Sequence, residues 1–146
     1  MVKVAVLDYG IGNLRSAQKA FEISGAEARL TADKDLVLAS DGVVLPGVGN
    51  FGKCAKALTD SGVRELALLA VENGLPFLGI CVGMQLLYKT SDESPAAKGL
   101  GLFSGKVKML ENAPRVPQMQ WNQIQLQKDS PLLRGLEDEW FYFVHS

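Results

Sequence analysis

Short, nearly continuous apolar runs alternate along the chain with segments whose apolar residues recur every three or four positions. The continuous runs predict strands buried on both faces of a parallel sheet, at residues 2–7, 43–45 and 76–80, and a second, shorter strand is expected at 27–30. The three- and four-residue spacing predicts helices, at residues 14–24, 35–39, 52–59 and 63–73, with another opening at 83–88. Residues typical of caps and breaks lie between these elements: Asn13 as an N-cap, Gly25 and Gly74 as helix stops, and Pro46 as the end of the third strand. This alternation predicts an α/β fold with a right-handed, doubly wound, mostly parallel sheet.

The amino-acid composition of the chain changes after about Ser91. Residues 99–144 are rich in Gly, Pro and Gln, with short strand candidates at 106–110, 124–126 and 140–144. We expect these to be antiparallel or edge strands added to the sheet after about residue 105. The chain shows no repeat, low-complexity tract or linker, so residues 1–146 are expected to form a single domain. The last seven residues form an apolar strand without a stop signal, which predicts that a C-terminal part of this domain is missing.

The amino-acid composition limits the classes of molecule that the chain is expected to bind. The 146 residues carry 15 Lys+Arg against 16 Asp+Glu, so no polycationic surface for nucleic acid is expected. No apolar run reaches the ~18 residues of a membrane span, and the N-terminus lacks the charged and small-residue regions of a signal peptide. We therefore expect a cytoplasmic protein with no membrane partner. Two cysteines and a single histidine argue against a disulfide framework and against a metal site.

The most informative motif is Gly-Ile-Cys-Val-Gly at residues 79–83, between a predicted buried strand and a predicted helix. G-x-C-x-G in this context is the pattern of a nucleophile elbow, a sharp turn that tolerates only small residues two positions from the nucleophile. The helix N-terminus is expected to favour the Cys81 thiolate, and the Val82 N–H to point where an oxyanion would develop. The alternative is a buried structural cysteine between glycines needed for packing.

A second glycine-rich segment, Leu-Pro-Gly-Val-Gly-Asn-Phe-Gly at 45–52, ends the third predicted strand. Ligands bind outside the carboxyl ends of strands in doubly wound sheets, and glycines let backbone N–H groups approach a substrate carbonyl. The alternative is an ordinary βα turn. Cys54, inside a predicted helix, is expected to be an inert core residue. The partial dinucleotide fingerprint at 10–13 lacks its third glycine, because Arg15 occupies that place, and is weak evidence.

Four segments carry a family resemblance: Asp-Tyr-Gly-Ile-Gly-Asn-Leu at 8–14, Pro-Gly-Val-Gly-Asn-Phe-Gly at 46–52, Met-Gln-Trp-Asn at 119–122, and Tyr-Phe-Val-His-Ser at 142–146. Together with the cysteine motif, they resemble class I (triad) glutamine amidotransferases, and among these the glutaminase subunits of imidazole glycerol phosphate synthase. The resemblance runs from Lys3 to the last residue. It implies a flavodoxin-like amidotransferase fold and no cofactor.

The resemblance also implies a function. The family hydrolyses L-glutamine to glutamate and ammonia, and the ammonia is channelled to a (β/α)₈ cyclase partner in a heterodimer. The partner makes imidazole glycerol phosphate and aminoimidazole carboxamide ribotide in histidine biosynthesis. By motif match, Cys81 is the nucleophile that forms a glutamyl thioester. The remaining implied roles are oxyanion donation by the N–H groups of Val48, Gly49 and Val82, glutamine binding by Gln85 and Glu93, and partner contact by Asn13 and Trp121.

Two positions and one absent motif depart from the family pattern. Val82 replaces a leucine, which matters little because only its backbone N–H is used, and Gln120 replaces a glycine near the expected partner interface. The His-Pro-x-Glu motif that completes the triad is absent. His145, the sole histidine, matches the family's Tyr-Phe-Val-His strand, which does not supply the triad base. The 146-residue chain is therefore expected to lack its general base and to be inactive alone.

Three other functions compete with this interpretation. A triad amidotransferase with another acceptor, such as the pyridoxal phosphate synthase glutaminase, shares the chemistry, but the segments at 119–122 and 142–146 argue against it. A different hydrolase with a cysteine elbow would usually lack Pro-Gly-x-Gly after the third strand. For this fragment, a non-catalytic doubly wound binding module also competes, because the base is missing.

Overall fold

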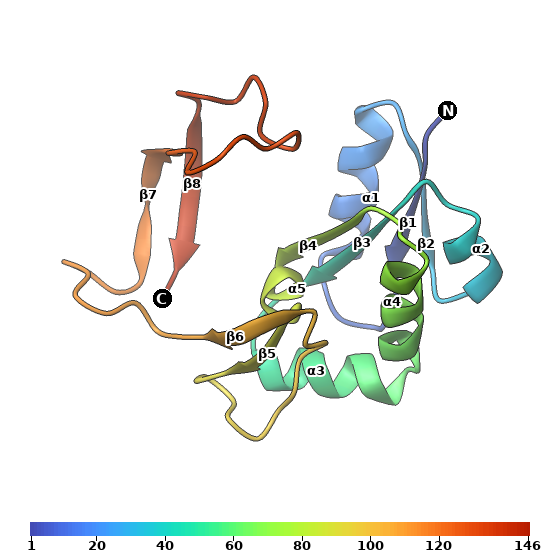
Figure 1. Ribbon diagram of the computed structural model, residues 1–146, viewed down its shortest axis with the longest axis horizontal. Coiled ribbons are helices and arrows are strands. Elements are labelled where there is room, and N and C mark those ends of the chain that lie inside the picture. Colours follow the sequence, from blue (N-terminus) through green and yellow to red (C-terminus); the bar gives the residue numbers. More distant parts are fainter. The chain divides into compact units, whose positions relative to one another are not determined.

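The computed structural model describes residues 1–146 as two compact units, Met1–Lys108 and Met109–Ser146. The first unit contains a four-stranded parallel sheet (Figure 1), in the order β2 (Glu27–Thr31), β1 (Lys3–Leu7), β3 (Gly42–Gly47) and β4 (Phe77–Cys81). With β1 between β2 and β3, this is the order in which flavodoxin-like sheets begin. The predicted parallel sheet is confirmed, with each of its four strands within two residues of the predicted bounds.

Helices cover both faces of this sheet (Figure 1). On one face, α1 (Leu14–Ile23) packs Ala17 and Phe21 against a small cluster that contains Val6 and Val44. The larger core lies on the opposite face, under α2 (Lys34–Leu38), α3 (Phe51–Asp60) and α4 (Val63–Glu72). Large side chains such as Leu58 are fully buried there, and each contributes roughly 1.5–3 kcal/mol. No helix has the length and apolarity to cross a bilayer.

The prediction that Pro46 ends the third strand is wrong. β3 continues to Gly47 and stays paired with β4, through Pro46↔Ile80 and Gly47↔Cys81. Proline is tolerated because β1 pairs with β3 only as far as Val44, so that Pro46 has one neighbouring strand and its missing N–H leaves no gap in a second ladder. The end of β3 therefore lies directly beside the cysteine turn.

The prediction of a helix at 83–88 is also wrong in extent. The helix α5 (Val82–Gln85) is one turn long, and the chain continues as β5 (Tyr88–Ser91), which pairs in parallel with β6 (Phe103–Val107) in a separate two-stranded sheet. The rings of Tyr88 and Phe103 pack with centroids 5.6 Å apart. This pairing with a distant segment overrides the local helical pattern, and it places β6 three residues earlier than predicted.

The second unit contains an antiparallel pair, β7 (Gln118–Gln123) and β8 (Trp140–His145). Antiparallel strands after residue 105 are thus confirmed, but β7 and β8 form their own sheet instead of extending the four-stranded one. The strand predicted at 124–126 is wrong, because β7 ends at Gln123. The polar sequence of β7 hides its strand character, which depends on pairing with β8, where Trp121 lies opposite Tyr142.

Candidate active site

Cys81 is the last residue of β4, and the chain turns there directly into α5. Its backbone has φ 55° and ψ −119°, a conformation that residues with a side chain rarely adopt and that is typical of functional turns. The Cys81 side chain is exposed. The predicted elbow, with its thiol projecting from a strained strand-to-helix turn, is confirmed as a geometry.

The two glycines of the motif are required by close backbone contacts. A Cβ at Gly79 would lie 2.5 Å from the Cα of Met84, and a Cβ at Gly83 would lie 1.8 Å from the backbone oxygen of Leu45. Neither contact can be relieved by moving a flexible side chain. The expectation that only glycine fits at these positions is therefore confirmed.

The N-terminus of α5 supplies backbone N–H groups beside the thiol. Val82, the first helical residue, is buried and directly follows Cys81. Because α5 has four residues, its electrostatic effect rests on the unpaired N–H groups of its first turn and not on the dipole of a long helix. The position of the Val82 N–H is compatible with the predicted oxyanion role.

The loop after β3 packs against this turn. Gly47 lies opposite Cys81 in the sheet, and a Cβ there would come within 2.5 Å of the Gly83 nitrogen and 3.1 Å of the Tyr9 hydroxyl. Val48 is half exposed, and Gly49 has φ 79° with open space around it. Sequence reasoning assigned these glycines to backbone freedom alone. It missed that Gly47 is also needed for contact with the elbow.

Two buried side chains hold carbonyl groups at the end of β3 and in the loop that follows it. The Tyr9 hydroxyl donates to the Pro46 carbonyl at 2.6 Å, and the Cys54 thiol donates to the Val48 carbonyl at 3.2 Å. Burial raises the pKa of Tyr9, and the neighbouring Cys54 raises it further. Cys54 is fully buried, as predicted, but its thiol is engaged with the loop. Tyr9 was missed, because an aromatic residue after a strand carries no signal for this role.

Glu93 contacts the start of α3. Its Oε2 accepts a hydrogen bond from the Phe51 N–H at 2.7 Å, and the Ser94 hydroxyl accepts from the Gly52 N–H at 3.2 Å. Asn50 completes the cap by accepting from the Lys53 N–H at 3.0 Å. Glu93 therefore lies beside the loop after β3, with one oxygen used to cap a helix.

The comparisons with known proteins identify the family. A family model described as glutamine amidotransferase class-I matches residues 5–146. The chain belongs to this family. Cys81 lies at the carboxyl end of β4, an edge strand of the four-stranded sheet.

Curated relatives and a solved structure agree with this assignment. The imidazole glycerol phosphate synthase subunit HisH of Methanothermobacter thermautotrophicus is 49% identical over 143 residues, covering 98% of this chain and 71% of the relative. The subunit HisH of Synechococcus elongatus is 47% identical over 148 residues, covering 99% and 68%. A crystal structure of a glutamine amidotransferase superposes with a TM-score of 0.73 at 22% identity, covering 97% of this chain and 70% of that one, and so shares the amidotransferase fold.

Two further predicted residues lie in the first unit. Gln85 ends α5, one turn after Cys81. Asn13 precedes α1 as predicted, but its side chain does not cap the helix backbone, and its Oδ1 accepts from the Ser16 hydroxyl at 2.8 Å. Gly12 lies close to Pro46, since a Cβ on it would be 3.4 Å from the Pro46 Cβ. The segment of Asn13 therefore borders the carboxyl end of β3.

The remaining predicted residues lie in the second unit. Trp121 is 62% exposed and packs against Tyr142, with ring centroids 5.5 Å apart. His145 ends β8, opposite Gln118, and its ring lies 6.1 Å from that of Phe143. The exposed aromatic face of β7 and β8 is compatible with a contact surface.

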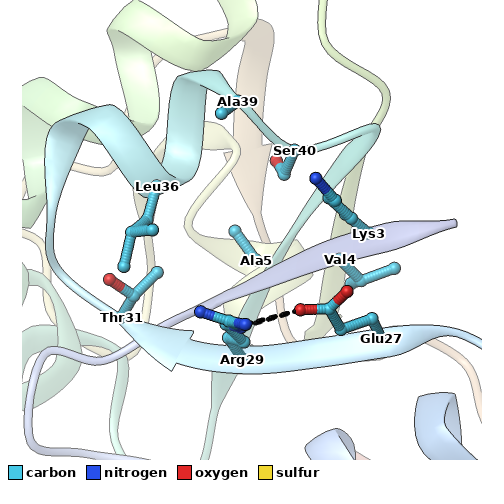
Figure 2. Close-up of a pocket in the computed structure, with 9 residues that line it drawn as sticks. All are labelled: Lys3, Val4, Ala5, Glu27, Arg29, Thr31, Leu36, Ala39 and Ser40. Atoms are coloured by element: carbon cyan, nitrogen blue, oxygen red, sulfur yellow. Dashed lines mark hydrogen bonds and ion pairs between the residues drawn. The ribbon is translucent and has the colours of Figure 1, made fainter. Parts of the chain in front are cut away.

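One pocket of the first unit lies away from the cysteine turn. It lies between β1, β2 and α2 (Figure 2), where Arg29 forms an ion pair with Glu27 at 2.7 Å, and it measures about 130 Å³. Small-molecule sites usually enclose ~300–1,000 Å³. None of the predicted site residues lines this pocket.

Proposed function

We propose that this chain is the glutaminase subunit of an imidazole glycerol phosphate synthase, which hydrolyses L-glutamine to glutamate and ammonia for use by a partner subunit. The observation that carries the proposal is the exposed Cys81 thiol on a strained turn between β4 and α5. The HisH subunits at 47% and 49% identity support the choice of this synthase among amidotransferases. The match to the amidotransferase family covers nearly all of this chain. This coverage also favours the glutaminase function over an unrelated cysteine hydrolase or a non-catalytic module.

The proposed reaction follows from the position of the thiol. The Cys81 thiolate attacks the carbonyl carbon of the glutamine side-chain amide, and the C=O electron pair moves to oxygen. Collapse of this tetrahedral species breaks the C–N bond, and the nitrogen takes up a proton and leaves as ammonia. Attack of water on the resulting thioester releases glutamate and restores the thiol.

The oxyanion and the substrate are held by neighbouring groups. The N–H groups of Val82 on α5 and of Val48 or Gly49 in the loop after β3 are the proposed oxyanion donors, each of which is typically worth 10²–10³ in rate. Gln85 and Glu93 are proposed to bind glutamine. The carboxylate of Glu93 has one oxygen engaged with Phe51, so its other oxygen is the one proposed for the substrate.

The proton transfers require a general base that these 146 residues do not contain. His145 is the sole histidine, and no His-Pro-x-Glu sequence is present. We propose that residues 1–146 form an amidotransferase domain without its C-terminal triad segment, and that a base beyond this sequence completes the chemistry.

The proposed partner is a cyclase with a (β/α)₈ barrel, bound as a heterodimer that channels ammonia between the two sites. Asn13, near the carboxyl end of β3, and Trp121, on the exposed face of β7, are the proposed contacts. A synthase subunit of this kind is proposed to act in the cytoplasm.

Labelling of the thiols tests the proposal. A diazo-ketone analogue of glutamine should alkylate Cys81, as seen by mass analysis of peptides, and should leave Cys54 unmodified because Cys54 is fully buried. Cys81→Ser should abolish labelling, while the matched variant Cys54→Ser should retain it. Labelling confined to Cys54 would show that the nucleophile has been misassigned.

A further inference from the structure

Two hydrogen bonds fix alternate peptide groups, one at the end of β3 and one in the loop that follows it. The Tyr9 hydroxyl holds the carbonyl of Pro46 at 2.6 Å, and the Cys54 thiol holds the carbonyl of Val48 at 3.2 Å. These donors come from separate elements, since Tyr9 follows β1 and Cys54 lies in α3. Both side chains are buried, with 4% and 0% of their surface exposed.

Holding a carbonyl also sets the direction of the N–H in the same peptide. In a trans peptide the C=O and the following N–H point in opposite directions, and the bonds after Pro46 and Val48 are both trans, since the sole cis bond is Val116–Pro117. Because the Cys54 thiol on α3 holds the Val48 carbonyl, the Gly49 N–H points away from Cys54. In the same way, the Tyr9 hydroxyl holds the Pro46 carbonyl, so the Gly47 N–H points away from Tyr9.

The need for a thiol at this point follows from the backbone. Gly49 has φ 79° and open space around it, so its own geometry places few limits on the orientation of the Val48–Gly49 peptide. A single buried donor then decides that orientation. Asn50, which follows, is fixed separately as the cap of α3.

We propose that Cys54 and Tyr9 are positioning residues for the oxyanion loop, Cys54 by orienting the Val48–Gly49 peptide and Tyr9 by orienting the Pro46–Gly47 peptide. This proposal rests on the glutaminase function proposed above, because the loop then supplies donors to the oxyanion. Tyr9 remains a donor across the neutral range, since burial and the nearby thiol raise its pKa.

The test compares two substitutions of one residue. Cys54→Ala removes the donor, whereas Cys54→Ser keeps a hydroxyl that can donate to the Val48 carbonyl, and both leave Cys81 as the only thiol. For each, the rate of Cys81 alkylation by the diazo-ketone glutamine analogue is divided by its rate with iodoacetamide, which needs no oxyanion donor. The ratio should fall about ten- to a hundredfold in Cys54→Ala and recover in Cys54→Ser. Tyr9→Phe, which keeps the ring, should lower the ratio as well.

Amide hydrogen exchange of the peptide spanning residues 46–50 provides a readout that does not depend on activity. Exchange should be faster in Cys54→Ala and Tyr9→Phe than in the parent and in Cys54→Ser. If the parent is not labelled by the glutamine analogue, the glutaminase proposal fails, and exchange alone decides the positioning roles. Equal labelling ratios, or unchanged exchange, in Cys54→Ala and Cys54→Ser would overturn the role of the thiol. If Cys54→Ala does not fold, Cys54→Val, which fills the buried space without a donor, replaces it in the same measurements, and Tyr9→Phe tests the role of Tyr9.

Discussion

Gly83→Ala should be the most damaging small substitution near the elbow. The added Cβ would lie 1.8 Å from the backbone oxygen of Leu45, whereas an ordinary contact begins at 3.4 Å. Because the opposing atom is backbone in a buried strand, the turn itself must move by well over an ångström. Overpacking typically costs 1–3 kcal/mol and at times more, and a backbone clash of this size belongs at the upper end. We expect a loss of about 3 kcal/mol in the free energy of unfolding.

A matched control separates the clash from the loss of a glycine. Gly74 has φ 74° and no atom within 4 Å of a built Cβ, so Gly74→Ala carries only the strain of a left-handed residue, ~1–2 kcal/mol. Urea denaturation followed by circular dichroism gives both free energies, provided the slope of each transition is unchanged.

A second measurement links the clash to the site. Displacement of the turn should also slow alkylation of Cys81 by the glutamine analogue in Gly83→Ala, but not in Gly74→Ala. If Gly83→Ala unfolds at the urea midpoint of the parent, or is no less stable than Gly74→Ala, the argument that the elbow is held by its packing on β3 is refuted.

Three further predictions follow from the site. Without a triad base, the 146-residue chain should release ammonia from glutamine at least about a hundredfold more slowly than a HisH relative with its partner; comparable turnover that is abolished by His145→Ala would contradict this. Glu93→Ala should lower the free energy of unfolding by ~1 kcal/mol, since the Phe51 N–H loses its acceptor, while Glu93→Gln should not, as measured by urea denaturation. In a chain that carries the triad segment, hydrolysis should be slow until the partner subunit binds its nucleotide, and Val48→Pro should blunt this activation without preventing complex formation; equal rates with and without the liganded partner would exclude such a switch.

The central fold could be predicted from the sequence because local pattern and tertiary environment agree there. The strands β1 and β3 are mostly apolar, and Gly25 and Gly74 follow the ends of α1 and α4. The errors fall where pairing with a distant segment decides the structure. Tyr88 continues a helical pattern but pairs with β6, and the polar residues around Gln120 form a strand only because β8 lies beside them.

The candidate site was predictable in part, for a similar reason. The nucleophile and its flanking glycines form a local motif, so Cys81, Gly79 and Gly83 could be read directly. The anchoring contacts of Tyr9 and Cys54 join segments 37 and 6 residues apart to the loop. The sequence around a buried thiol or hydroxyl shows no periodic pattern that would reveal such a contact.

The elbow and the loop after β3 behave as one packed unit. Position 83 requires glycine because the Leu45 backbone lies against it. Position 47 requires glycine because a larger residue would clash with the Gly83 nitrogen and the Tyr9 hydroxyl. The strained Cys81 conformation is therefore supported by β3 as well as by its own strand. In contrast, the peptide after Val48 is held by one thiol and is flanked by a glycine with open space. The nucleophile is thus fixed by steric contacts that allow little movement, whereas the proposed oxyanion donor at Gly49 is set by a single hydrogen bond and can be changed without disturbing the nucleophile.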